Sequence, residues 1–353
     1  MLLVEACAPG PLPPGLASPT PTTRAVGTVT CRLPVFNWAW VTSGSSSSVV
    51  GQNGFVDLST GTFAPDSNAQ FDYDQSSARY QSQQLPVLKG DGSGFYDAAV
   101  GRWVPAPAQH VLPDGSAYVY EVELPDPHAY QIHLVEVATG ADRVVYQMPY
   151  DNGYSVVAFQ REGIYVQPIL HKSGLPGGLW LYDIATSTLK AIPNASTGTW
   201  QSVVDGAAWG GAGGTAGNTL TRLNVETGQT TTWFSHTVQG AVFEGYGYGV
   251  SLLGFDDASH PLVEVFPPGN GSPNPNQPGE PEVWLVNAPG QATKLSGISL
   301  RADAALSPGL SDPHGLWLVG ADGIYLYTDA GFRRAAPLAP APSSNYALEG
   351  TCA

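Results

Sequence analysis

An all-β fold built from repeated antiparallel units is predicted by three features of this sequence: its composition, a turn repeated at a regular spacing, and a second turn inside each repeat. The composition comes first. Of 353 residues, 42 are Gly and 31 are Pro, and 12% are charged, against roughly one-quarter in an average domain. So many helix breakers exclude a helical bundle or coiled coil. Disorder is excluded as well, because 42% hydrophobic content with 9 Trp, 16 Tyr and 11 Phe can form a core.

The repeated turn sets the size of the unit. A short apolar strand runs into a turn that contains Asp, Asn or Thr and ends at Gly or Ser, and a second strand follows. The seven turns are FVDLSTG, FYDAAVG, VEVATG, LYDIATS, LNVETG, LVNAPG and LYTDAG, ending at residues 61, 101, 140, 187, 228, 290 and 331. One long step contains a proline-rich insertion, Pro267 to Pro281. The other steps, about 40–47 residues, match the length of a four-stranded propeller blade.

A second turn divides each unit into four strands. Asp-Gly or Glu-Gly between apolar runs is a hairpin signal, because Gly accepts a positive φ and Asp bonds back to the chain. One unit shows the whole pattern, with SVVAFQ, the turn REG, IYVQPIL, a loop, GLWLYDI, the turn ATS, and TLKAIP. We denote the strands of a unit a to d, with a nearest the axis of the ring.

The repeats resemble known propeller families. VLPDGSAYVY followed by YQIHLVEVATGADRVVYQ is similar to the TolB-type (PD40) repeat, and DPHGLWLVGADGIYLYTDAG is similar to the propeller repeat of two-component-regulator sensor domains. The resemblance covers about residues 31–353 and weakens in the first two units. It implies a β-propeller and is almost silent on function.

Seven c–d turns predict seven blades, with six as the alternative if the first two units merge. Too few residues precede Gly61 to complete a first blade, so we expect Asn345–Cys352 to supply its missing strand. Cys31 and Cys352 would then meet, and a disulfide would join the two ends of the propeller. Such a bond implies an oxidising, extracytoplasmic compartment, either the cell surface or the secreted fraction.

The first 30 residues are predicted to lie outside the propeller. Met1–Cys7 resembles the end of a bacterial lipoprotein signal, with Cys7 as the lipidated residue. The match departs from the pattern in its short apolar run and in Glu5, so either the true start lies upstream or the match is chance. Residues 8–30 contain six prolines and several Ser and Thr, as a tether does.

Charge and motifs restrict the functions that can be considered. A formal charge of −15 without a basic patch argues against nucleic-acid binding. Nucleophile-elbow, zinc-helix, Walker and dinucleotide-binding motifs are all missing from the sequence. We therefore expect no cofactor and no metal site, a monomer, and membrane contact only through the lipid anchor.

Ligand binding is expected on the face that carries the d–a and b–c loops, where propellers usually bind around the central channel. Aromatic rings there would stack on sugars or other flat ligands. The alternative is that these rings cap the core. The candidate residues are His110, Tyr150, Asp151, Tyr154, Trp200 and His236.

The sequence thus favours an exported, membrane-tethered propeller that binds a protein or carbohydrate and catalyses nothing. An extracellular carbohydrate lyase or hydrolase is the alternative, with Glu121, Asp126 and Asp151 as possible acid and base. A third hypothesis is a structural surface protein. His314, beside Asp312, is expected to be a turn residue, and so are Asp256, Asp257 and His260.

Overall fold

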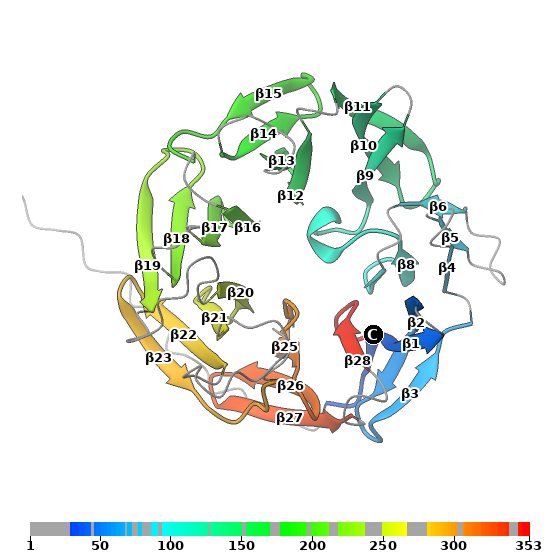
Figure 1. Cartoon of the computed structure of the whole chain (residues 1–353), viewed down its shortest axis with the longest axis vertical. Coiled ribbons are helices and arrows are strands. Elements are labelled where there is room, and N and C mark those ends of the chain that lie inside the picture. Colours follow the sequence, from blue (N-terminus) through cyan, green and yellow to red (C-terminus); the bar gives the residue numbers. More distant parts are fainter. Residues whose placement is uncertain are drawn as a thin grey trace, which may run out of the picture.

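The chain forms a ring of antiparallel sheets around a central axis, as the computed structural model in Figure 1 shows. It describes residues 29–43, 46–67, 69–72, 77–79, 86–90, 94–125, 128–149, 153–169, 177–195, 199–211, 218–236, 249–266, 281–301, 306–338 and 345–353. The predicted all-β propeller is therefore correct. Within the described residues, no helix has the length and apolar character needed to cross a membrane.

The described residues form six blades. Four are four-stranded sheets of consecutive strands: β12–β15 (Tyr154–Gln160, Gly163–Pro168, Trp180–Asp183, Thr188–Ala191), β16–β19 (Thr199–Val204, Ala207–Gly211, Asn218–Asn224, Thr230–His236), β20–β23 (Gly249–Phe255, Pro261–Phe266, Glu282–Ala288, Gln291–Leu295) and β24–β27 (Leu310–Asp312, Gly315–Val319, Gly323–Thr328, Gly331–Pro337).

The blade β9–β11 (Ala117–Pro125, His128–Glu136, Asp142–Pro149) is three-stranded. Its innermost position is occupied by a short 3-10 helix, η1 (Ala108–His110), and by Val111, which bridges Tyr118. The Asp114-Gly115 hairpin turn therefore forms as predicted, but its first arm is a single bridge.

The remaining blade joins the two ends of the propeller. Its strand order is β28 (Asn345–Leu348), β1 (Arg32–Ser43), β2 (Ser46–Asp57) and β3 (Thr62–Pro65). β28 pairs antiparallel with β1, Val35 opposite Leu348 and Trp38 opposite Asn345, and Figure 1 shows the red β28 beside the blue β1. Cys31 and Cys352 form a disulfide with 5.5 Å between their Cα atoms. The predicted closure of the first blade by the C-terminal segment is confirmed.

The prediction of seven blades is wrong, and the six-bladed alternative gives the correct number. The turn that ends at Gly101 does form, with the Gly101 N–H donating to the Asp97 carbonyl. The two strands of this turn, β7 (Phe95–Asp97) and β8 (Arg102–Val104), form a sheet of their own, and the strands before it, β4–β6 (Gln70–Asp72, Ser77–Arg79, Leu88–Lys89), form a second small sheet instead of completing a blade. Residues 70–84 are mostly polar in sequence, whereas strands that are buried on both faces of a sheet are rich in apolar residues.

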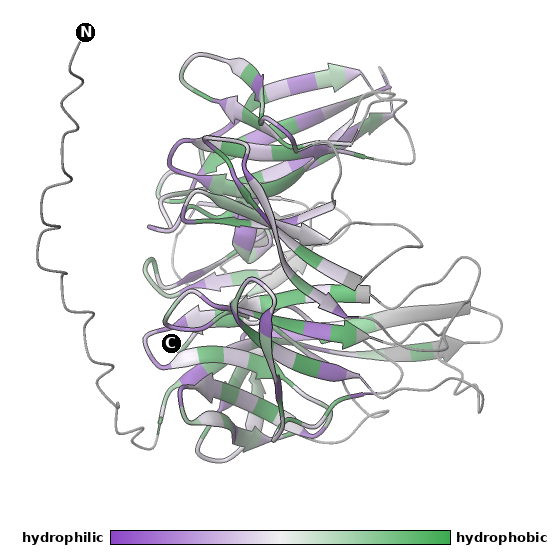
Figure 2. Cartoon of the chain, turned by 90° about the vertical axis from the view of Figure 1, so that its left-hand side faces the viewer, coloured by the Kyte–Doolittle hydropathy of each residue, from purple (hydrophilic) through white to green (hydrophobic). Residues whose placement is uncertain are grey.

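The core lies between neighbouring blades rather than at the axis. Each joint has its own cluster of buried side chains, such as the one where Trp317, fully buried on β25, meets Leu33 and Val35 of β1. A side view shows strands running from one face of the disc to the other, with the C-terminus on the left-hand face (Figure 2). The a–b and c–d turns lie on that face, here called the turn face, and strands a and c begin at the opposite, loop face.

Candidate functional site

Two of the predicted ligand residues lie in the core. His110, at the end of η1, is 6% exposed, and its Nε2 lies 3.3 Å from the Val156 carbonyl oxygen of the next blade. Trp200, on β16, is 3% exposed and donates from Nε1 to the Ala195 carbonyl. Both side chains join structural elements in this conformation, and their predicted role toward a ligand stays a prediction.

Tyr154 stands at the first residue of β12 and is half-buried. Its ring packs edge-on against Trp180, with 5.4 Å between the centroids, and burial raises the pKa of its phenol. Tyr150 and Asp151, predicted beside it, lie outside the described residues, as does Cys7. The structure therefore brings Tyr154 together with an aromatic residue of its own blade.

His236 lies in a cluster that joins two blades at the loop face. It is the last residue of β19, and its ring stacks parallel to Phe234, with an interplanar angle of 3°. The Trp284 ring on β22 lies 5.7 Å from His236. Glu282, the first residue of β22, places Oε2 at 3.8 Å from His236 Nε2. We call His236, Phe234, Glu282, Trp284 and Lys294 the rim cluster.

Glu282 is the polar centre of the rim cluster. Its Oε2 accepts a hydrogen bond from Trp284 Nε1 at 2.9 Å, and its Oε1 accepts one from Lys294 Nζ at 2.6 Å. Partial burial raises the pKa of this carboxyl, but the two hydrogen bonds and the charges of Lys294 and His236 outweigh that effect and lower it. The group is thus an anchored carboxylate between an ammonium, an indole and an imidazole.

The rim cluster has the composition of a recognition surface. An indole offers a flat apolar face, while carboxylate, ammonium and imidazole groups offer hydrogen bonds in several directions. Lys294 is 55% exposed, and the side chains of His236 and Glu282 are 22% and 23% exposed. In sequence, His236 precedes residues 237–248, and Glu282 follows the proline-rich insertion, both predicted loops of this face. Sequence reasoning identified His236 but missed the other four, since Glu282, Trp284 and Lys294 become neighbours of His236 only when two blades pack.

The predicted acid–base residues have a structural role where they can be described. Glu121, on β9, accepts a hydrogen bond at Oε1 from the Val156 N–H of the neighbouring blade, with 2.6 Å between the atoms. Asp126 and Asp151 lie outside the described residues. The structure therefore shows Glu121 as a tie between two blades.

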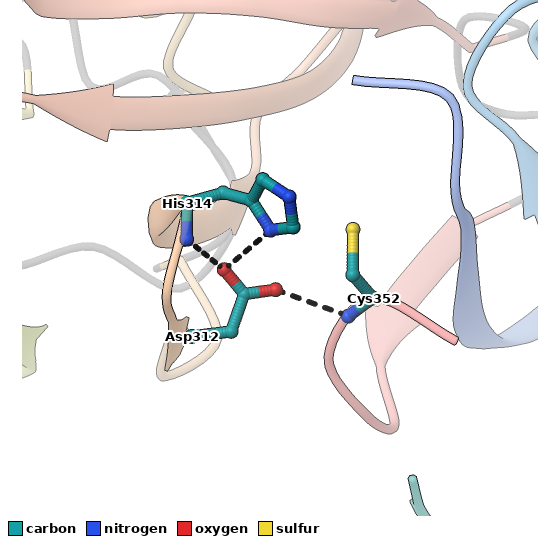
Figure 3. Close-up of side chains that lie close together, drawn as sticks. All are labelled: Asp312, His314 and Cys352. Carbon is teal, nitrogen blue, oxygen red and sulfur yellow. Dashed lines mark hydrogen bonds and ion pairs between the residues drawn. The ribbon is translucent and has the colours of Figure 1, made fainter. Parts of the chain in front are cut away.

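Two Asp–His pairs lie in turns on the turn face, as predicted for turn residues. Asp256 accepts hydrogen bonds from the Ala258 and His260 N–H groups and contacts His260 Nδ1 at 3.0 Å. Asp312 accepts from the His314 N–H at 2.7 Å and contacts His314 Nδ1 at 3.1 Å. Asp312 differs in also binding the C-terminal segment (Figure 3), where its Oδ2 accepts from the Cys352 N–H at 3.2 Å.

A further polar cluster was not anticipated from the sequence. Tyr120 Oη, His133 Nδ1 and Asp142 come together from β9, β10 and β11, with 3.0 Å between Tyr120 Oη and Asp142 Oδ2 and 2.8 Å between His133 Nδ1 and Asp142 Oδ1. Burial, followed by the Asp142 carboxylate, raises the pKa of the Tyr120 phenol. A phenol held neutral is a poor nucleophile, so this cluster ties the three strands together. The sequence signal that could have revealed this cluster is the alternation of side chains between the two faces of three adjacent strands.

The comparisons with known proteins identify similar structures. No family model and no curated protein matches the chain. Solved structures similar to it include TolB from Acinetobacter baumannii, with 13% identity over 90% of this chain and 67% of that one and a TM-score of 0.45. Oligogalacturonate lyase in complex with manganese has 13% identity over 87% of this chain and 86% of that one, with a TM-score of 0.43.

A third similar structure is the β-propeller domain of the Trilobed protease from Pyrococcus furiosus. Its identity is 9% over 87% of this chain and 86% of that one, with a TM-score of 0.36. The likeness concerns the propeller fold. The lipoprotein resemblance of the first residues is not tested by it.

Proposed function

We propose that this chain is an exported β-propeller that binds a protein or carbohydrate ligand at the rim cluster. The observation that carries the proposal is the arrangement around Glu282, a carboxylate held by Lys294 and Trp284 beside the His236 ring. The half-buried ring of Trp284 would stack on a flat ligand, and Lys294 and Glu282 would fix its orientation.

Export is supported by the disulfide that joins the two ends of the propeller. Disulfides form and persist in oxidising compartments, and they are rare in the reducing cytosol. A lipid on Cys7, with residues 8–30 as the tether, would then hold the propeller at a membrane surface. This part of the proposal is checked by labelling with a radioactive fatty acid in a bacterial host, where Cys7→Ser should abolish incorporation.

Ligand binding is tested with the whole chain against a panel of oligosaccharides and a panel of surface proteins from the source. Trp284→Ala and Lys294→Gln should each weaken the affinity for whatever ligand is found, by about 10-fold or more if these are anchor residues. Trp180→Ala is the matched control, because Trp180 is also a half-buried indole on the third strand of a blade and contacts Tyr154. Equal losses in Trp284→Ala and Trp180→Ala would contradict a site at the rim cluster.

The carbohydrate panel also distinguishes the enzymatic alternative from the binding proposal. A carbohydrate lyase or hydrolase would release products from a polysaccharide, whereas a binding module would leave it unchanged. Turnover that His236→Ala or Glu282→Gln abolishes would replace the binding proposal with a catalytic one.

A further inference from the structure

The disulfide lies beside two potential metal ligands on the turn face. Ligand atoms of Asp312, His314 and Cys352 are all within 4.8 Å of one another, and Cys31 Sγ is bonded to Cys352 Sγ. Figure 3 shows His314 and Cys352 on either side of the Asp312 carboxylate. Four side chains of metal-ligating type therefore meet where the two ends of the propeller join.

The donor set becomes suitable for zinc when the disulfide is reduced. Two thiolates and an imidazole form the set that Zn²⁺ accepts in tetrahedral sites, with Zn–S near 2.3 Å and Zn–N near 2.0–2.1 Å. Two sulfur ligands at that distance are about 3.8 Å apart in a tetrahedron. The 5.5 Å between the Cα atoms of Cys31 and Cys352 allows this separation by side-chain rotation alone.

Asp312 is placed to orient His314 rather than to bind the ion. Its Oδ1 faces the N–H and Nδ1 of His314 at 2.7 and 3.1 Å, and its Oδ2 accepts from Trp317 Nε1 and the Cys352 N–H at 2.8 and 3.2 Å. Both oxygens are thus fully engaged. A carboxylate that fixes one imidazole nitrogen leaves the other, Nε2, for the metal, an arrangement common around zinc.

We propose that the reduced form of this chain binds one Zn²⁺ ion through Cys31, Cys352 and His314, with Asp312 as the positioning residue. A dithiol supplies two electrons and two protons, the S–S bond breaks, two thiols form, and the dithiol becomes a disulfide. Zn²⁺ then displaces one proton from each thiol as the two Zn–S bonds form, and a water completes the tetrahedron. The ion would join the two ends of the propeller before oxidation replaces it with the disulfide.

Access to the site is compatible with this exchange. The His314 side chain is 43% exposed, whereas that of Asp312 is 5% exposed, and both cysteines are half-buried. The exposed His314 imidazole therefore gives an ion in solvent a first contact beside the two half-buried cysteines.

The experiment uses Co²⁺ as a spectroscopic substitute for Zn²⁺. The full chain is reduced with a dithiol, the dithiol is removed without air, and Co²⁺ is added at neutral pH. We expect one Co²⁺ per chain, with the visible bands of a tetrahedral site and a thiolate-to-metal band in the near ultraviolet, all displaced by one equivalent of Zn²⁺. The oxidised chain should show none of these bands.

Variants assign the ligands. His314→Ala should weaken Co²⁺ affinity by 10-fold or more, and Asp312→Asn by about 10-fold, the usual cost of losing a group that orients a ligand. Cys31→Ser should roughly halve the thiolate band, because one of two thiolates is lost. His260→Ala is the matched control, since His260 pairs with Asp256 in the same way and the described residues bring no cysteine to that turn.

Equal binding by oxidised and reduced chains would overturn the proposal, and so would a His314→Ala affinity within a factor of three of the parent or a His260→Ala loss as large as that of His314→Ala. Circular dichroism covers the case in which reduction unfolds the chain. Zn²⁺ should then restore the near-ultraviolet signal of the parent but not of His314→Ala, and failure to do so would also overturn it.

Discussion

The two joints on either side of the blade β24–β27 each contain a buried carboxylate, but the two carboxylates differ in how many hydrogen bonds they accept. At the joint with the first blade, both oxygens of Asp312 are engaged, with donors from its own turn, from Trp317 and from Cys352. At the joint with β20–β23, Glu264 of β21 is 1% exposed and accepts one hydrogen bond, from the Leu306 N–H to Oε2 at 2.8 Å. Its Oε1 has no hydrogen-bond partner in the described part of the chain.

A buried carboxylate at a blade joint needs hydrogen-bond donors for both of its oxygens. Burial raises the pKa of Glu264 to about 7, and the single Leu306 hydrogen bond offsets only part of that effect. At another blade joint, Gln167 of β13 makes its hydrogen bonds to the neighbouring blade with an amide instead of a carboxylate. Its Oε1 accepts from the Trp200 N–H at 2.9 Å, and its Nε2 donates to the Trp200 carbonyl at 3.1 Å. An amide can satisfy a donor and an acceptor on the neighbouring strand without carrying charge.

Removing the Cys31–Cys352 disulfide, at the joint between the blade β24–β27 and the first blade, should cause the largest loss of stability. Cys31→Ser with Cys352→Ser opens a loop that spans 321 residues in sequence, and we expect a loss of roughly 3–5 kcal/mol in the free energy of unfolding. Denaturant unfolding of the parent under oxidising conditions and of the double variant measures it. Identical midpoints would show that β28 pairing and Asp312 close the propeller without the disulfide.

The Asp312 hydrogen bonds come next. Asp312→Ala leaves the buried Trp317 Nε1 and the Cys352 N–H without their acceptor, and each unsatisfied buried donor costs about 1–3 kcal/mol. We expect a loss of about 2–3 kcal/mol in the free energy of unfolding. Asp256→Ala is the control, because the Asp256 oxygens bind groups of its own turn, the exposed Ala258 and the half-buried His260, and this variant should lose less stability. An equal loss in both would contradict the special role of Asp312.

Glu264 makes the second joint sensitive to pH. Its folded-state pKa lies near 7, above the ordinary 4.5, so its stabilising contribution is fully present below pH 4.5 and is lost as pH rises through 7. The largest possible change is about 3 kcal/mol, at about 1.4 kcal/mol per pKa unit. Glu264→Gln should match the parent near pH 4.5 and exceed its stability near pH 8 by about 1–3 kcal/mol. Parallel stability–pH curves for the two proteins would contradict the shifted pKa.

The amide tie should have the smallest effect. Gln167→Ala removes both hydrogen bonds to Trp200 and should cost roughly 1–2 kcal/mol in the free energy of unfolding. Gln167→Glu sharpens the comparison with Glu264, because it restores an acceptor for the Trp200 N–H but not a donor for its carbonyl. If Gln167→Glu is as stable as the parent at pH 8, the account of why an amide suits this joint is wrong.

Much of the fold follows from local sequence signals. Asp205 and Gly206 both adopt positive φ, 49° and 71°, which is what a tight Asp-Gly hairpin requires. The unit SVVAFQ to TLKAIP forms β12–β15 close to its predicted limits. The number of blades was harder to predict, because a c–d turn at Gly101 forms locally whether or not its strands extend into a full sheet.

The all-β class, the repeat length and the turns could be predicted from the sequence, because a hairpin turn depends on residues a few positions apart. The joining of Cys31 to Cys352 could also be predicted, because the two end segments complete one sheet. The tertiary structure alone decided the blade number, the rim cluster and which carboxylates are satisfied. Glu264 accepts a hydrogen bond from Leu306, and His236 contacts Glu282, although each pair is more than 40 residues apart in sequence. Contacts of that kind depend on how two sheets pack, and no periodicity within either sheet specifies it.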